Sequence, residues 1–127
     1  MKGAYASAMG LVFVIDDDAD SRDTLADVLG EEGYQVQTSG DATEALKRLE
    51  EGLRPDVILL DLVMPGMSGD ELLQRLRATA DLAMVPVVVL SARVDWQPPD
   101  GVESLRKPVE LAAVLDAVRA HTLAQHP

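Results

Sequence analysis

The chain has 127 residues, of which 47% are hydrophobic and 26% are charged, and this is the size and composition of one globular domain. It contains no cysteine, which excludes disulfides, thiolate metal sites and a cysteine nucleophile. Its 22 acidic and 11 basic residues give a net charge of −11, so we expect no direct binding of this chain to nucleic acid or to an anionic membrane.

The first residues do not resemble a targeting signal, because residues 1–10 carry one lysine and scattered small side chains. No apolar run reaches the roughly 20 residues that a membrane helix needs, so we expect a cytoplasmic protein. Residues 1–10 are predicted to be an N-terminal tail, residues 11–121 one folded domain and residues 122–127 a C-terminal tail. Because only six residues follow His121, the sequence predicts no output domain in this chain.

Five short apolar runs predict β-strands, and helix-period patterns follow four of them. The runs cover residues 11–15, 34–38, 57–60, 85–90 and 102–105. The helix-period positions follow the first, second, third and fifth runs and are Leu25, Val28, Leu29; Ala42, Ala45, Leu46, Leu49; Leu72, Leu73, Leu76; and Leu111, Val114, Leu115, Val118. Pairs of capping-box form, Asp41 with Glu44 and Ser68 with Glu71, mark the starts of the second and third helices.

This alternation of strand and helix predicts a doubly wound α/β fold. The first, third and fourth runs are apolar at consecutive positions, as expected for a parallel sheet that helices cover on both faces. The crossover between strands four and five is different, because it is short and contains Pro98 and Pro99, which do not fit inside an ordinary helix. We therefore expect helix four to be shortened or replaced by a loop. Trp96, the only tryptophan, is expected to pack beneath this loop rather than to contact a partner.

Polar residues follow four of the predicted strands at the point where each strand ends. They are Asp16, Asp17 and Asp18 after the first strand, Asp61 after the third, Ser91 after the fourth, and Lys107 with Pro108 after the fifth. Ligands of an open parallel sheet bind beyond the carboxyl ends of its strands, so we expect these groups to converge there. Crowded carboxylates favour a divalent cation, and Mg²⁺ prefers oxygen ligands. With one carboxylate as nucleophile, the pattern predicts metal-assisted phosphoryl transfer through an aspartyl phosphate.

Four stretches resemble the receiver domain of two-component response regulators: VFVIDDDAD, VILLDLVMPGMSG, VVVLSAR and LRKPVE. They follow the family's order across residues 11–121, the predicted receiver domain. The resemblance implies a five-stranded sheet in the flavodoxin-like order 2-1-3-4-5, an order for which a chemotaxis member of this family is a standard example. It implies a signalling domain rather than an enzyme, with at most self-phosphorylation from small donors and self-dephosphorylation. The implied partners are a sensor histidine kinase or phosphotransfer protein and a downstream protein that the sequence does not identify.

The resemblance also assigns roles to the acidic residues. Asp61 would be the phosphoacceptor of a two-component phosphorelay. Asp16, Asp17 and Asp61 would hold Mg²⁺ together with the backbone carbonyl of Val63. Asp17 would be the more direct ligand of the acid pair, and Asp16 would bind partly through water. Asp18 is expected to be a capping or solvated residue.

The remaining roles implied by the resemblance lie after strands four and five. Ser91 would donate its hydroxyl to one phosphoryl oxygen and Lys107 would pair with another, and the peptide bond between Lys107 and Pro108 would be cis. Two features depart from the family: Ser104 stands where an aromatic switch residue is usual, and the fourth helix is expected to be missing. We therefore expect phosphorylation to change mainly the loops around Asp61 and Ser91, without driving dimerisation through the last helix.

Other functions fit these residues less well. A calcium loop starting at Asp16 would need glycine at its sixth position and glutamate at its twelfth, where the chain has Ser21 and Asp27. An aspartate-nucleophile phosphohydrolase would carry threonine or valine where Asp20 stands, and a flavin-binding protein would have a hydroxyl-rich loop where this one is acidic. The alternative that stays open is a receiver-fold module that docks a partner without using phosphorylation. Phosphorylation of Asp61 by a small phosphodonor would separate the two functions.

Overall fold

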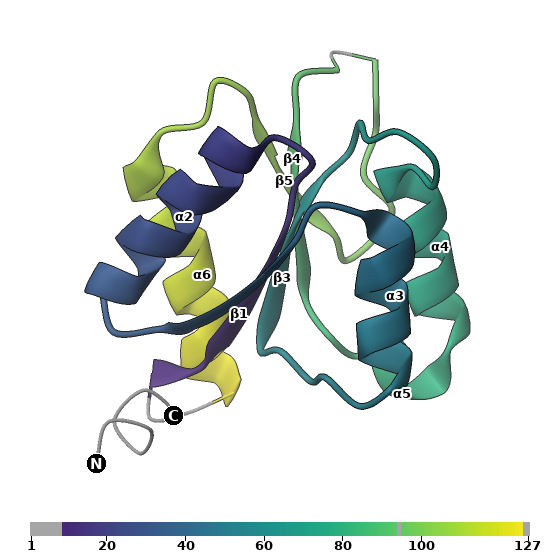
Figure 1. Ribbon diagram of the computed structural model, residues 1–127, viewed down its shortest axis with the longest axis horizontal. Coiled ribbons are helices and arrows are strands. Elements are labelled where there is room, and N and C mark those ends of the chain that lie inside the picture. The colour runs from purple at the N-terminus through teal and green to yellow at the C-terminus, as the bar shows by residue number, and fades with distance from the viewer. Residues whose placement is uncertain (1–8, 94, 126–127) are drawn as a thin grey trace.

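The computed structural model describes residues 9–93 and 95–125, and they form a five-stranded parallel sheet with helices on both faces (Figure 1). The strand order is β2-β1-β3-β4-β5, which confirms the predicted order. The strands are β1 (Leu11–Ile15), β2 (Gln35–Ser39), β3 (Val57–Asp61), β4 (Val87–Ser91) and β5 (Glu103–Arg106). The helices are α2 (Ala19–Glu31), α3 (Ala42–Glu50), α4 (Gly69–Ala78), α5 (Ala80–Ala83) and α6 (Leu111–Gln125).

The sheet separates two apolar layers. Helices α2 and α6 lie on one face, and α3 and α4 lie on the other (Figure 1). Successive strand residues point to opposite faces, so Val12, Val14 and Leu59 pack in the α2/α6 layer while Phe13 and Ile58 pack in the α3/α4 layer. Every residue of β3 and β4 is buried. The prediction of central strands that are covered on both faces is therefore confirmed.

Three helices begin at residues whose side chains accept hydrogen bonds from free amides of the first turn. Asp18 caps α2 by accepting from the Asp20 amide at 3.2 Å, as expected for that residue. Asp41 caps α3 and Ser68 caps α4, the latter through the Glu71 amide at 3.2 Å. Each of these helices follows a strand after a short turn. The caps therefore fix where the chain leaves the edge at which the polar residues collect.

The crossover from β4 to β5 contains no helix in its described residues, 92, 93 and 95–102. This confirms the prediction that a loop replaces the fourth crossover helix, which is a different element from the helix labelled α4. This loop passes beside α4 (Figure 1). Trp96 is partly buried against the α3/α4 layer, as expected. The loop thus contributes the Trp96 side chain to the apolar layer on this face.

Some element boundaries differ from the sequence-based expectation. Strand β4 begins at Val87 instead of residue 85, because the amide of Val85 donates to Leu82 in the turn that follows the unpredicted short helix α5. Helix α6 continues to Gln125, four residues past the predicted domain end at 121. Of the predicted tails, residues 1–8 and 126–127 lie outside the described residues. Among the described residues, no helix is both long and apolar enough to cross a bilayer.

Candidate functional site

Three carboxylates meet where β1 and β3 end. One carboxylate oxygen from each of Asp16, Asp17 and Asp61 lies within 4.8 Å of the others, and we call these three residues the acid cluster. Asp16 and Asp17 follow β1 directly, and Asp61 is the last residue of β3. Because β1 and β3 are parallel neighbours, their carboxyl ends lie at the same edge of the sheet. The structure therefore brings together the three side chains that the sequence selected.

Asp16 is held by its surroundings, whereas Asp17 is open to solvent. Asp16 is 2% exposed, its amide donates to the Ser39 carbonyl at 3.0 Å, and its carboxylate accepts from the Asp18 amide at 2.9 Å. The guanidinium of Arg22 donates to the Asp16 carbonyl at 2.7 Å. Asp17 is exposed. A solvent-facing carboxylate beside a fixed one suits a cation that keeps part of its water shell.

Asp61 is a buried carboxylate of the site whose pKa is shifted. It is 6% exposed, and its Oδ1 lies 3.2 Å from Lys107 Nζ and 3.4 Å from the amide nitrogen of Val63, which donates to it. Burial raises the pKa of the Asp61 carboxyl above its ordinary value of 3.8; the Lys107 charge opposes this shift and the Asp16 charge adds to it. A cation among the three carboxylates would relieve this repulsion. The donor set, all oxygen and all at one edge, therefore fits Mg²⁺.

Ser91 and Lys107 complete the site from β4 and the end of β5. Ser91 is 5% exposed, and its Oγ accepts from the Arg93 amide at 3.0 Å. The Lys107 amide donates to the Ser91 carbonyl at 2.9 Å, and the following peptide bond, to Pro108, is cis. The Lys107 ammonium reaches Asp61, and Ser91 is the last residue of β4, the strand that pairs with β3 beside Asp61.

The segment after Asp61 contains a residue that sequence reasoning missed. Gly69, the first residue of α4, donates its amide to the Leu62 carbonyl at 2.9 Å. A Cβ atom built at Gly69 would lie 2.6 Å from the Asp61 carbonyl oxygen and 2.7 Å from the Leu62 Cα. No side chain fits there, so α4 packs directly on the backbone that carries the candidate phosphoacceptor. A glycine one residue after the capping serine was the available sign.

Arg22 is a second residue that sequence reasoning missed. Besides donating to the Asp16 carbonyl, its guanidinium lies where a side chain at residue 40 would begin: a Cβ built at Gly40 would be 2.7 Å from Arg22 Nη1. An arginine in the first turn of the helix that follows the acid pair was the sign available in the sequence. Arg22 and Gly40 together support the peptide that carries the acid pair.

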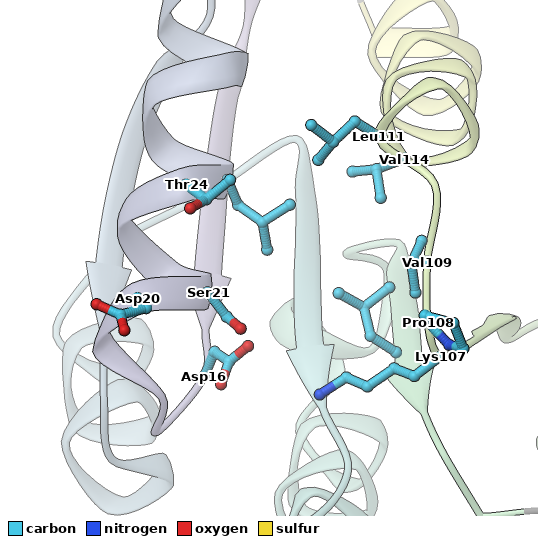
Figure 2. A pocket seen from close by; sticks show the side chains of 11 residues that line it. Asp16, Asp20, Ser21, Thr24, Lys107, Pro108, Val109, Leu111 and Val114 are labelled. Atoms are coloured by element: carbon cyan, nitrogen blue, oxygen red, sulfur yellow. The ribbon is translucent and has the colours of Figure 1, made fainter.

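A cavity of about 370 Å³ opens beside the acid cluster, between α2 and the start of α6 (Figure 2). Asp16 and Lys107 lie at one end of it, and the apolar side chains of Leu111 and Val114 lie at the other. The cavity thus has a charged end beside the site and an apolar end beside α6.

Ser104 lies outside the acid cluster, on the exposed edge strand β5. It pairs in register with Val89, a residue of the α3/α4 layer. Ser104 therefore lies on the face of the sheet that the missing helix between β4 and β5 would cover. An aromatic side chain at residue 104 would have had no helix to pack against. The polar residue and the missing helix are therefore consistent with each other.

Comparison with known proteins identifies the family. Residues 12–119 match the response regulator receiver domain. The DNA-binding response regulator MtrA of Mycolicibacterium paratuberculosis is 44% identical over 84 residues, which are 66% of this chain and 36% of that protein. The two-component response regulator PhoP of Pseudomonas aeruginosa is 40% identical over 94 residues, which are 74% of this chain and 40% of that protein. The chain thus spans well under half the length of these curated relatives.

Solved structures agree with this assignment. The receiver domain of the Francisella response regulator 1452 superposes with a TM-score of 0.80 at 28% identity, covering 91% of this chain and 98% of that one. The chemotaxis response regulator CheY4 of Vibrio cholerae superposes with a TM-score of 0.77 at 27% identity, covering 89% and 98%. The protein belongs to the response regulator receiver domain family.

Proposed function

We propose that this chain is a phosphoacceptor domain of a two-component phosphorelay, in which Asp61 takes a phosphoryl group from a phosphohistidine of a sensor histidine kinase or phosphotransfer protein. The observation that carries the proposal is the meeting of Asp16, Asp17 and Lys107 around the buried Asp61 carboxylate. Three acids without a cation would repel one another, and a lysine beside them pairs with only part of their charge. Phosphoryl transfer with Mg²⁺ uses all four groups.

In the proposed reaction, one carboxylate oxygen of Asp61 forms a bond to phosphorus while the bond between phosphorus and the donor's imidazole nitrogen breaks. The imidazole leaves and Asp61 becomes an acyl phosphate. Mg²⁺, when bound by the acid cluster and the Val63 carbonyl, would neutralise charge on the phosphoryl oxygens. The Lys107 ammonium would leave Asp61 for a phosphoryl oxygen, and the Ser91 hydroxyl would donate to another. The chain is then the acceptor of the group and not a catalyst acting on a separate substrate.

The test is phosphorylation of the wild-type chain and of Asp61→Asn by acetyl phosphate with Mg²⁺, followed by intact mass. We expect the wild type to gain one phosphoryl group and the Asn variant, which lacks the nucleophilic oxygen, to gain none. Omitting Mg²⁺ should prevent labelling of the wild type. Equal labelling of both chains would reject Asp61 as the acceptor.

A second function, docking of a partner without phosphorylation, is favoured by one observation. Ser104 and the loop before it replace the aromatic residue and the helix that the family commonly uses to report phosphorylation. A folded wild-type chain that stays unlabelled in the acetyl phosphate experiment would support this function instead.

The setting of the proposed reaction is the cytoplasm. MtrA is described as DNA-binding; this chain matches only a part of it and has a net charge of −11. We therefore propose that this chain itself contacts a protein partner and not nucleic acid.

A further inference from the structure

The loop between β4 and β5 makes two of its side-chain contacts with α4 through one carboxylate, that of Asp70. Asp70, in the first turn of α4, accepts a hydrogen bond from the indole nitrogen of Trp96 on Oδ1 at 2.7 Å. Its other oxygen, Oδ2, lies 3.4 Å from Nη1 of Arg93. We call Asp70, Arg93 and Trp96 the clasp. Both carboxylate oxygens of Asp70 are thus used by a loop that lies more than 20 residues further along the chain.

The clasp is connected to Ser91 through Arg93. The Arg93 side chain binds Asp70, while its amide donates to Ser91 Oγ at 3.0 Å. A serine hydroxyl can accept one hydrogen bond and donate its own hydrogen at the same time. With one of its two lone pairs bonded to the Arg93 amide, the Ser91 hydroxyl keeps its hydrogen free for a phosphoryl oxygen. The orientation of this hydroxyl therefore depends on where the loop holds the Arg93 amide.

Asp70 is also connected to Asp61, from the other side. It follows Gly69, the residue whose Cα lies against the Asp61 carbonyl with no room for a side chain. The start of α4 and the end of β3 are therefore packed backbone to backbone. A loop fastened to Asp70 is positioned relative to the phosphoacceptor itself.

We propose that Asp70 is a positioning residue for the phosphoryl-transfer reaction, because it holds the loop that orients the Ser91 hydroxyl toward the group on Asp61. This inference rests on the proposed function and deepens it. In this chain the clasp does with two side-chain contacts what a helix after β4 would do by packing. Trp96 contributes apolar contact with the α3/α4 layer, and Arg93 contributes the link to Ser91.

The test compares rate constants of phosphorylation by acetyl phosphate for Asp70→Ala, Glu71→Ala and wild type. Glu71 is the matched control, because it lies in the same turn and pairs with Arg75 on α4 itself, away from the loop. We expect Asp70→Ala to react about threefold to tenfold more slowly than wild type, an effect within the range of interaction energies measured between residues in contact. Glu71→Ala should react at the wild-type rate. The Mg²⁺ concentration that gives half the maximal rate should be the same in all three chains, because the clasp does not touch the acid cluster.

A double-mutant cycle with Ser91→Ala distinguishes positioning from a general structural role. If Asp70 acts through the Ser91 hydroxyl, Asp70→Ala should slow wild type but cause no further slowing of Ser91→Ala. Trp96→Phe keeps the aromatic packing and removes the N–H donor, so it tests the clasp even if Asp70→Ala does not fold. It should slow the reaction in the same Ser91-dependent way.

Three outcomes would overturn the proposal, and the first can be distinguished from the other two. A wild-type chain that takes no phosphoryl group overturns the proposed function and this inference together. A wild type that is labelled normally, with Asp70→Ala and Trp96→Phe as fast as Glu71→Ala, overturns the positioning role alone. Equal slowing by Asp70→Ala in the presence and absence of the Ser91 hydroxyl also overturns it.

Discussion

The two halves of the site are held in different ways. On the acid side, the Asp16 amide bonds to the β2 backbone, and the Gly69 amide bonds to the Leu62 carbonyl next to Asp61. On the other side, Ser91 depends on the Arg93 amide, which belongs to a loop fastened by partly exposed side chains. Backbone contacts between buried elements break only when the elements separate, whereas exposed ion pairs contribute little. The acid half is therefore held by backbone contacts, whereas the direction of the Ser91 hydroxyl depends on side-chain contacts of the loop.

The largest effect on the acid half is expected from Gly69→Ala, which disturbs the backbone contact between α4 and the end of β3. Its Cβ would overlap the Asp61 carbonyl, and a backbone atom cannot rotate away. We expect the free energy of unfolding to fall by about 2 kcal/mol. Urea unfolding measures it, with Gly30→Ala as control, because Gly30 lies in α2 with no atom within 4 Å of its added Cβ. The control should gain about 0.5 to 1 kcal/mol. A stable Gly69→Ala would show that α4 is not packed on the strand that carries Asp61.

The next effect concerns the exposed member of the acid cluster. Asp17→Ala should weaken Mg²⁺ binding by about tenfold or more, because it removes one of few protein ligands from the proposed site. Calorimetric titration of Mg²⁺ measures it. Asp18→Ala is the matched control: Asp18 caps α2 through the Asp20 amide, so its loss should cost about 1 kcal/mol of stability. If Asp18→Ala lost as much Mg²⁺ affinity as Asp17→Ala, the ligand assignment would be wrong.

A smaller effect is expected in the pH dependence of stability. Folding raises the pKa of Asp61 above its unfolded value, near 3.8. At a pH between the unfolded and the folded pKa, the folded chain therefore binds more protons than the unfolded chain. The contribution of Asp61 to stability is therefore present at low pH and is lost as the pH rises through this window. Without Mg²⁺, Asp61→Asn should unfold at a higher temperature than wild type at neutral pH, with a difference that shrinks in acid.

Thermal unfolding across pH provides the measurement for this prediction. Asp23→Asn, which removes an exposed carboxylate from α2, serves as the control for the loss of one negative charge. A difference between Asp61→Asn and wild type that stayed constant from acid to neutral pH would mean that burial does not penalise the Asp61 charge.

The smallest effect is a predicted lack of change in oligomeric state. Beryllium fluoride, which mimics the phosphoryl group, should leave the mass measured by light scattering unchanged. The face without a helix between β4 and β5 has few contacts that could differ between the free and the phosphorylated state. Arg119 on α6 pairs with Glu32 of the same chain at 4.0 Å. An activated dimer that Arg119→Glu disrupts would show that phosphorylation drives dimerisation through α6 even without the aromatic residue and the helix between β4 and β5.

Much of this architecture follows from local sequence pattern. Apolar runs set β1 and β3, and capping residues such as Ser68 set the helix starts, because these features depend on residues close in the chain. The acid cluster was predictable for a related reason: carboxyl ends of parallel strands share one edge. The clasp and the close approach of Gly69 were not, because they join segments far apart whose spacing only the folded chain sets. The short helix α5 was missed because four residues give too little periodicity.

The loop between β4 and β5 also has a consequence for local unfolding. Val102 donates its amide to the Pro99 carbonyl at 3.1 Å, while the loop's fastenings to α4 come from side chains, through Asp70 and through Arg77, which binds the Asp100 carbonyl at 3.1 Å. Such contacts can release without separating any strands of the sheet. Amides in residues 95–102 should therefore exchange with solvent at rates governed by local opening, well before the global unfolding that exposes β3. A protease should therefore cleave within this segment while the rest of the domain is still folded.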